Sequence, residues 1–241
     1  MTPFFRKMRK NMADDNRPIK YARYAIGEIV LVVIGILIAL QINNWNEAKK
    51  LKKEEVKALK ELRDDLLLNI EDFSGNVHGY TLSRDSNKTI MNVIDQGLEY
   101  KDTLEYVFGR LYPLVTMVAN NGTYESLKER GLNLISNDSL RKVVTRYYSK
   151  DIVFVKTVES KNVKALSDAL LTPFLMEEFT TVEPFVLRPN DFERLRTNNY
   201  FRELLANLHF FCYWSIAKNN ELIITANQLI EMIDQEVEAY Q

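Results

Sequence analysis

Few residues in this chain have the type and spacing that acid–base or metal chemistry requires. The two histidines, His78 and His209, lie far apart, and neither has a histidine, cysteine or carboxylate neighbour at a spacing typical of a metal site. Cys212 is the one cysteine, so the chain can form neither an internal disulfide nor a cysteine-based metal cluster. The sequence therefore predicts no metal site.

Two pairs of adjacent carboxylates are the remaining candidates for general acid–base catalysis. They are Asp64–Asp65 and Glu177–Glu178. Neighbouring residues on a helix point about 100° apart, so neither pair forms an acid–base couple by itself. The sequence also has no glycine-rich phosphate loop and no GxSxG motif. We therefore expect no catalytic residue and no cofactor, and we expect that the protein is not an enzyme.

Small polar residues occupy the centre of the last amphipathic segment. Cys212, Ser215 and Asn219 stand at positions where leucine would pack better. One interpretation is a close approach of two helices with an internal hydrogen bond. The other is a small pocket inside a helical bundle, as in helical sensory domains. A small-molecule ligand is compatible with the second interpretation, but no motif supports one.

The same segment repeats apolar residues in heptads. Two sets of positions at intervals of seven form a seam of about five heptads. They are Phe201, Leu208, Ser215, Leu222 and Leu229, and Leu205, Cys212, Asn219, Ala226 and Ile233. This seam predicts one long final helix at about 198–238, a length typical of bundles and coiled coils. The predicted fold is all-α: a single N-terminal transmembrane helix that continues into an antiparallel helical bundle.

The transmembrane helix is predicted from the stretch YAIGEIVLVVIGILIALQINNWNE, which begins at Tyr24. The eighteen residues between Glu28 and Glu47 carry no charge. A helix from Ala25 to Ile42 would be about 27 Å long, close to the ~30 Å hydrocarbon thickness of a bilayer. Tyr24 and Trp45 flank it where interfacial aromatic residues sit, and Glu28 lies at the edge, where a carboxylate costs less than at the centre. We interpret the stretch as an uncleaved signal-anchor.

Three residues of this helix are small or polar and share one face. Gly35, Ala39 and Asn43 are spaced by four residues. Small residues let a second helix approach closely, and Asn43 could hydrogen-bond across such a pair. The alternative is the ordinary use of glycine and alanine in a membrane helix. The first interpretation predicts a homo-oligomer or contact with another membrane protein.

The charge distribution indicates how the chain is placed in the membrane. Residues 1–23 hold seven Lys and Arg against two Asp, and six lysines follow in the twenty residues after the apolar run. These counts nearly tie, but long domains translocate largely regardless of charge, whereas short basic tails resist translocation. We expect the inner membrane, a cytoplasmic N-terminus and a periplasmic bundle. The basic tail suits anionic lipid, and the acidic remainder argues against nucleic acid.

The predicted organisation has three parts. They are a basic tail at 1–23, a transmembrane helix at 24–45 and a bundle domain at 46–241. The bundle begins with a stalk helix at about 46–73, which Gly75 and Gly79 weaken, and a second helical stretch follows at about 80–98. Thr180–Pro189 is predicted to be a loop.

Three stretches of the sequence resemble a known family. They are FFRKMRK at Phe4–Lys10, the apolar stretch that begins at Tyr24, and TYESLKERGLNLISNDSLRKVVTRYY at Thr123–Tyr148. The chain is similar to a Bacteroidetes family of uncharacterised single-pass membrane proteins, a domain of unknown function. The resemblance covers most of the chain and implies a location in the cell envelope of a Gram-negative bacterium. It implies no reaction and no site residue.

Two functions of different classes fit these observations. The first is a cell-envelope scaffold or accessory subunit that acts through helix–helix contacts. The second is a periplasmic ligand-sensing bundle that signals through a partner. An exposed apolar face on the bundle would favour the first function, and an enclosed cavity near Asn219 would favour the second.

Overall fold

The computed structural model describes residues 18–240 of the chain. It divides into two compact units, Met1–Glu54 and Glu55–Gln241. Most of the predicted basic tail, 1–23, lies outside the described residues.

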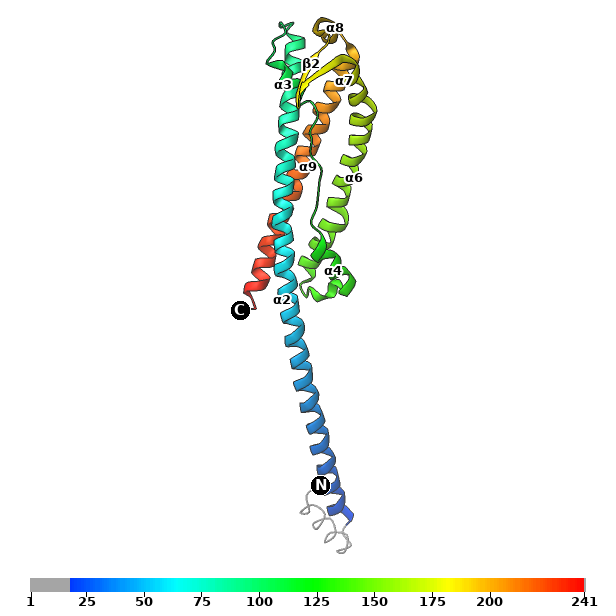
Figure 1. The fold of residues 1–241 in the computed structure, drawn as a ribbon. Coiled ribbons are helices and arrows are strands. Elements are labelled where there is room, and N and C mark those ends of the chain that lie inside the picture. The colour runs from blue at the N-terminus through cyan, green and yellow to red at the C-terminus, as the bar shows by residue number, and fades with distance from the viewer. Residues whose placement is uncertain (1–17, 241) are drawn as a thin grey trace. The chain divides into compact units, whose positions relative to one another are not determined.

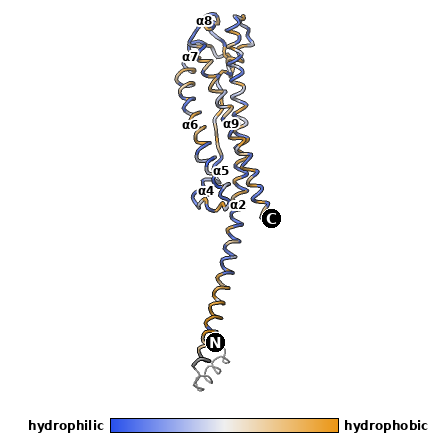
Figure 2. Tube along the Cα trace, turned by 180° about the vertical axis from the view of Figure 1, so that it is seen from behind, coloured by the Kyte–Doolittle hydropathy of each residue, from blue (hydrophilic) through white to orange (hydrophobic). Residues whose placement is uncertain are grey.

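The first unit holds the N-terminal part of helix α2, which is Pro18–Asp95. Every residue from 29 to 50 is exposed, because no other described part of this unit covers them. Figure 2 shows hydrophobic residues gathered on the part of this helix nearest the N-terminus. By length and composition, α2 is the one helix among the described residues that is long and apolar enough to cross a membrane.

Helix α2 does not end after residue 73, which corrects the prediction of two separate helices at about 46–73 and 80–98. It continues through Gly75 and Gly79 to Asp95. Gly79 has a packing role: a Cβ atom there would lie 2.3 Å from Val115 Cγ1. The glycine therefore lets the segment around Val115 pass close to the helix.

The second unit is built from the remainder of α2 and the elements after it (Figure 1). In chain order they are α3 (Leu104–Phe108), α4 (Gly122–Arg130), η1 (Leu132–Leu134), α5 (Asp138–Arg146), η2 (Tyr147–Asp151), α6 (Ile152–Asn162), η3 (Val163–Leu171), α7 (Thr172–Glu178), β1 (Phe179–Glu183), β2 (Val186–Pro189), α8 (Phe192–Arg196) and α9 (Asn199–Glu238). The segments η2 and η3 are π-helical, and η1 is a 3₁₀ turn.

Two ion pairs show that α2 and α9 are antiparallel. Arg63 Nε lies 2.8 Å from Asp234 Oδ1, and Arg202 Nη1 lies 2.7 Å from Asp95 Oδ1. Within the second unit, the start of α2 therefore lies beside the end of α9, and the end of α2 lies beside the start of α9. The antiparallel helical bundle predicted from the sequence is confirmed.

The predicted heptad seam is the buried face of α9. All ten of its positions are buried. Leu222, Leu229 and Ile233 belong to the same core cluster as Leu59 and Leu62 of α2. The helix itself begins at Asn199, after the Asn198 side chain accepts a hydrogen bond from Phe201 N, and ends at Glu238. The predicted range of about 198–238 is confirmed.

The helical path from Asp138 to Glu178 passes through both π-helical segments. Pro173 does not end it, because this residue stands in the first turn of α7, where a helix does not need the proline's missing N–H group. A π-helical turn holds one residue more than an α-helical turn would, and such turns are frequent at functional sites. Helix α6 is therefore bounded at both ends by this less common geometry.

The predicted loop at Thr180–Pro189 is instead a β-hairpin of strands β1 and β2, which are antiparallel. Its β-branched residues favour strand geometry, and the two prolines fall at the turn and at the end of β2. Arg188 Nε donates to Glu105 Oε1 at 2.6 Å, which ties the hairpin to α3. Beside it, Gly109 faces the backbone of Phe185, a turn residue with a φ of 63°.

Candidate functional site

A buried layer of polar side chains lies where α2, α6 and α9 meet. The three residues predicted from the heptad seam, Cys212, Ser215 and Asn219, are each fully buried on α9. Glu159 from α6 is only 4% exposed, and Tyr80 from α2 is 2% exposed. The structure thus brings the predicted residues together and adds a carboxylate and a phenol to them.

Hydrogen bonds connect α9 to the other two helices in this layer. Asn219 Nδ2 donates to Glu159 Oε1 at 2.8 Å and to the Ser215 carbonyl oxygen at 2.9 Å. The Cys212 thiol lies 3.4 Å from the Ser83 hydroxyl of α2. The internal hydrogen bond of the first sequence interpretation is therefore present. The pocket interpretation of these residues stays a prediction.

Glu159 was not among the residues singled out from the sequence. A signal was available in the helical spacing. Ile152 and Val155 are buried, and Glu159 follows Val155 by four residues on the same face of α6. A carboxylate at such a position is rarely fully buried without a charged partner.

Burial raises the pKa of Glu159 to about 7, well above its ordinary 4.5. Hydrogen bonds from Asn219 and Tyr80 act in the opposite direction, and the negative charge of Asp72 on α2 adds to the increase. Burial also raises the pKa of the Tyr80 phenol, and it raises the pKa of the Cys212 thiol to about 11. At neutral pH, Cys212 is therefore a thiol with little nucleophilic character.

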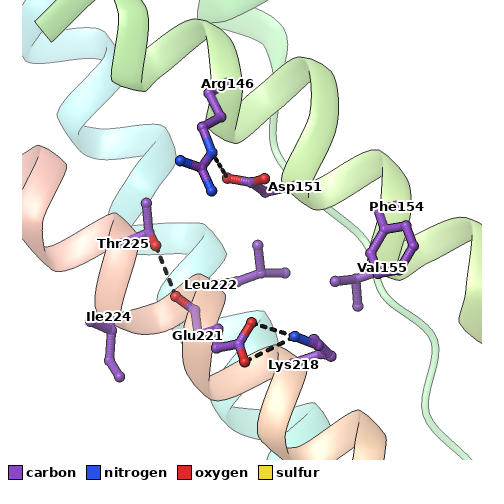
Figure 3. Close-up of a pocket in the computed structure, with 9 residues that line it drawn as sticks. All are labelled: Arg146, Asp151, Phe154, Val155, Lys218, Glu221, Leu222, Ile224 and Thr225. Carbon is purple, nitrogen blue, oxygen red and sulfur yellow. Dashed lines mark hydrogen bonds and ion pairs between the residues drawn. The ribbon is translucent and has the colours of Figure 1, made fainter. Parts of the chain in front are cut away.

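A half-open groove of about 400 Å³ lies between α6 and α9 (Figure 3). Val155 and Leu222 form its apolar floor, and Phe154 and Ile224 stand beside them. Four charged residues at its rim form two ion pairs. They are Arg146 with Asp151 at 3.4 Å and Lys218 with Glu221 at 2.7 Å. Because each cation has an acidic partner, the groove is better suited to an apolar surface than to an anion.

The most exposed residues of α9 beside this groove are uncharged over four turns, while Lys218, 30% exposed, stands at the groove rim. All exposed residues of α9 between 206 and 220 are uncharged, and two are large aromatic residues. They are Ala206, Asn207, Phe210, Tyr213, Ala217 and Asn220. The outer face of a helix at a solvent boundary normally carries charged residues. Phe210 is 70% exposed and Tyr213 is 63% exposed, so these rings have no cover in the structure. We name this set the α9 face.

The α9 face and the groove are continuous. Ile224, which is 58% exposed, lies one turn beyond Asn220 and also lines the groove. Phe154 of α6 stacks edge-on against Trp214 of α9, with ring centroids 6.3 Å apart. Together these residues form an apolar surface that spans two helices, and surfaces of this kind mark interaction sites more often than single exposed residues do.

The residues predicted to act in the membrane lie on the exposed helix of the first unit. Tyr24 is 55% and Trp45 is 62% exposed, and the Lys49 ammonium lies 5.4 Å from the centre of the Trp45 ring. Glu28 lies between them, and it is half-buried. These positions are those expected of interfacial residues, but no contact in the structure tests that role.

The proposed membrane packing face is also uncovered. Gly35, Ala39 and Asn43 are exposed, and no atom lies within 4 Å of a Cβ built at Gly35. The role of this face in helix pairing stays a prediction.

Replacement of Gly35 by isoleucine is expected to abolish association of the transmembrane segment. A branched side chain would separate two backbones that should nearly touch, and lipid supplies no hydrophobic force to offset the lost contacts. A transmembrane-association reporter that carries residues 24–45 measures this effect. Val33→Ile, which changes an exposed position off the small-residue face, is the control. If Gly35→Ile associates as well as the native segment, the pairing hypothesis is wrong.

Among the described residues, no group of three or more histidine, cysteine or acidic side chains is placed to hold a metal ion.

The fold and these surfaces define a class of protein: an all-α bundle with, among residues 18–240, one helix that is long and apolar enough to span a membrane. Within this class, the chain belongs to a family of unknown function, DUF6090, whose sequence model matches residues 28–169. No curated protein and no solved structure matches the chain. The resemblance to a family of unknown function is confirmed. The match extends from the apolar helix through Glu159 and ends before α9.

Proposed function

We propose that this protein is a membrane-anchored scaffold or accessory subunit of the cell envelope that acts through helix–helix contacts. The observation that supports the proposal is the uncharged α9 face and its continuity with the groove between α6 and α9. In the proposed placement, the apolar helix spans the inner membrane, the N-terminus is cytoplasmic and the bundle is periplasmic.

The shape and charge of this surface suit a partner helix. An amphipathic helix that binds in a groove presents apolar residues every three or four positions and keeps its polar face in water. The apolar floor at Val155 and Leu222 would accept such side chains, and the ion-paired rim would contact the polar edges. Tyr213 and Phe210 would add aromatic area, which is the kind of contact that dominates interface energies.

A site-specific photo-crosslinker tests this surface in the intact protein in its native membrane. Crosslinking from Tyr213 and from Ile224 is expected to give the same discrete adduct. The exposed residue Glu129 on α4 is the control position and should give none.

The adduct should disappear in Ala217→Glu, which places a charge on the α9 face. It should remain in Asn92→Glu, which places the same charge on the outside of α2. Both positions are exposed, so neither change should alter stability by more than about 0.5 kcal/mol.

The adduct identifies the kind of partner. Another membrane protein or a second copy of the chain supports the proposal, because both are helix–helix contacts at the predicted face. Equal crosslinking at Glu129, or an adduct that survives Ala217→Glu, would show that the α9 face is not the docking surface.

The proposed orientation predicts the side on which introduced cysteines react. In a Cys212→Ser background, Glu238→Cys should react with a membrane-impermeant thiol reagent after the outer membrane is permeabilised. Asn11→Cys should react only after the inner membrane is also opened. Labelling with the sides reversed would place the bundle in the cytoplasm.

A ligand-sensing bundle is the second candidate function. The buried layer at Glu159 and Asn219 favours it, because polar groups inside an apolar core are retained at a cost in stability. A ligand that entered this layer would shift the melting temperature of the purified protein. An Asn219→Leu variant should lose that shift, whereas the scaffold function predicts no small-molecule shift at all.

A further inference from the structure

The carboxyl group of Glu159 is the point at which three helices of the bundle meet. It lies on α6, accepts a hydrogen bond from Asn219 of α9, and faces the Tyr80 phenol of α2. Its 4% exposure separates it from bulk water. The state of this one group therefore affects how α6 packs against both of its neighbours.

The groups around the carboxyl provide no positive charge. The titratable side chains that face it are Asp72 and Tyr80 from α2 and Tyr112 from the segment between α3 and α4, with Cys212 of α9 nearby. None of these is basic. An ionised carboxylate here would lack the paired cation that normally makes burial tolerable.

One buried acceptor in the same layer, Asn219 Oδ1, has no hydrogen-bond partner. An amide oxygen can only accept a hydrogen bond, and a protonated carboxyl group has a hydroxyl to donate, which a carboxylate lacks. An unfilled acceptor in this layer is compatible with the neutral acid. Asn219, Tyr80 and Ser215 donate hydrogen bonds that favour the anion, but burial without a facing cation outweighs them and raises the carboxyl's pKa.

Helix α6 lies between two segments of π-helical geometry. The π-helical segments η2 and η3 end it on both sides, at Asp151 and Val163. Their wider turns give weaker, more adjustable backbone hydrogen bonding than an α-helix, which makes them suitable places for a helix to shift. Phe154 and Val155, which line the groove, belong to this same short helix.

We propose that α6 is a proton-gated wall of the groove: protonated Glu159 holds α6 against α9, and loss of the proton releases α6 and opens the groove. This inference rests on the proposed function in one respect, because it assigns regulation to the groove that would bind the partner helix. The movement itself is a property of the chain alone, so it can be measured without any partner.

Trp214 reports directly on the contact between α6 and α9, because its ring packs against Phe154. The chain has two tryptophans, so a Trp45→Phe background leaves Trp214 as the sole emitter. In the full-length protein in mild detergent, the emission maximum is expected to shift to longer wavelength, and acrylamide quenching to rise, as pH increases from 5.5 to 8.5. The midpoint should fall at about pH 7. Glu159→Gln should remain at the low-pH emission throughout.

Three controls separate this transition from other causes. Glu231→Gln removes an exposed carboxylate of α9 and should titrate like the parent. A His78→Gln, His209→Gln double variant should also keep the transition, which would assign it to Glu159 rather than to a histidine. Asp72→Asn removes the nearby negative charge and should move the midpoint to lower pH. A defect that was only structural would not move the midpoint in that direction.

Hydrogen exchange at one pH provides a second measurement. At pH 8, the amides of α6 should be at least about tenfold better protected in Glu159→Gln than in the parent, while those of α4 should be unchanged. A constant emission maximum across the range, or a transition that persists in Glu159→Gln, would overturn the proposal. Either result would leave the crosslinking test of the α9 face unaffected.

Discussion

At pH 8, the Glu159→Gln variant is expected to be more stable than the native protein by about 3 kcal/mol in the free energy of unfolding. The pKa of the native carboxyl is about 7 in the folded protein, whereas the ordinary value for a glutamate is 4.5. Each unit of difference in pKa corresponds to about 1.4 kcal/mol. Glutamine keeps the size of the side chain and a carbonyl that can accept the hydrogen bond from Asn219. It removes the cost of ionisation inside the bundle.

The pH dependence of this difference has a defined sign. Between pH 4.5 and 7, the folded chain holds a proton at Glu159 that the unfolded chain has released, so native stability falls as the pH rises through this window. The gain from Glu159→Gln should be constant above pH 7, shrink towards pH 4.5 and vanish below it.

Urea unfolding followed by Trp214 fluorescence at several pH values measures this gain in stability. Glu231→Gln is the matched control and should change stability by less than about 0.5 kcal/mol. A variant less stable than the native protein at pH 8 would show that the carboxylate is stabilising.

The Gly109→Ala variant is expected to lose about 2 to 3 kcal/mol of stability and to loosen the hairpin. A Cβ at this position would lie 1.7 Å from the Phe185 carbonyl oxygen and 2.3 Å from its carbonyl carbon. Because both are backbone atoms, the clash cannot be relieved by rotation of a side chain. Overpacking of this kind typically costs 1–3 kcal/mol. Urea unfolding measures the loss, and limited proteolysis between Phe179 and Pro189 measures the loosened hairpin.

Gly75→Ala is the control for this change. Gly75 lies inside α2, and nothing is within 4 Å of a Cβ built there. Alanine is the better helix former, so this variant should gain up to about 1 kcal/mol. Equal stability of Gly109→Ala and the native protein would mean that α3 and the hairpin do not approach as closely as described.

The regular features of the sequence predicted the regular features of the fold. The heptads of α9 identified ten of the twelve buried positions of that helix, because one helix with one buried side repeats every three or four residues. The apolar run predicted the helix that could span a membrane for a similar reason: length and composition alone define such a segment.

The parts that could not be predicted depend on contacts between distant residues. Gly79 appeared to weaken a helix, but its role is to let Val115 approach, which only the folded chain reveals. The hairpin at Thr180–Pro189 was predicted to be a loop because its prolines were given more weight than its β-branched residues. Glu159 was not singled out from the sequence, because Asn219, the partner that marks its role, lies sixty residues away.

The pairing of α2 with α9 has a consequence for how the chain is made. Arg63 and Asp234 are 171 residues apart, and the core that contains Leu59 and Leu62 is completed only by Leu222, Leu229 and Ile233. At about 5–20 residues per second, a ribosome needs roughly 10–35 s to synthesise the intervening chain. During that interval the apolar stripe of α2 can pack only on the segments between Met117 and Val155, and the side that packs on α9 stays exposed until the last helix has emerged.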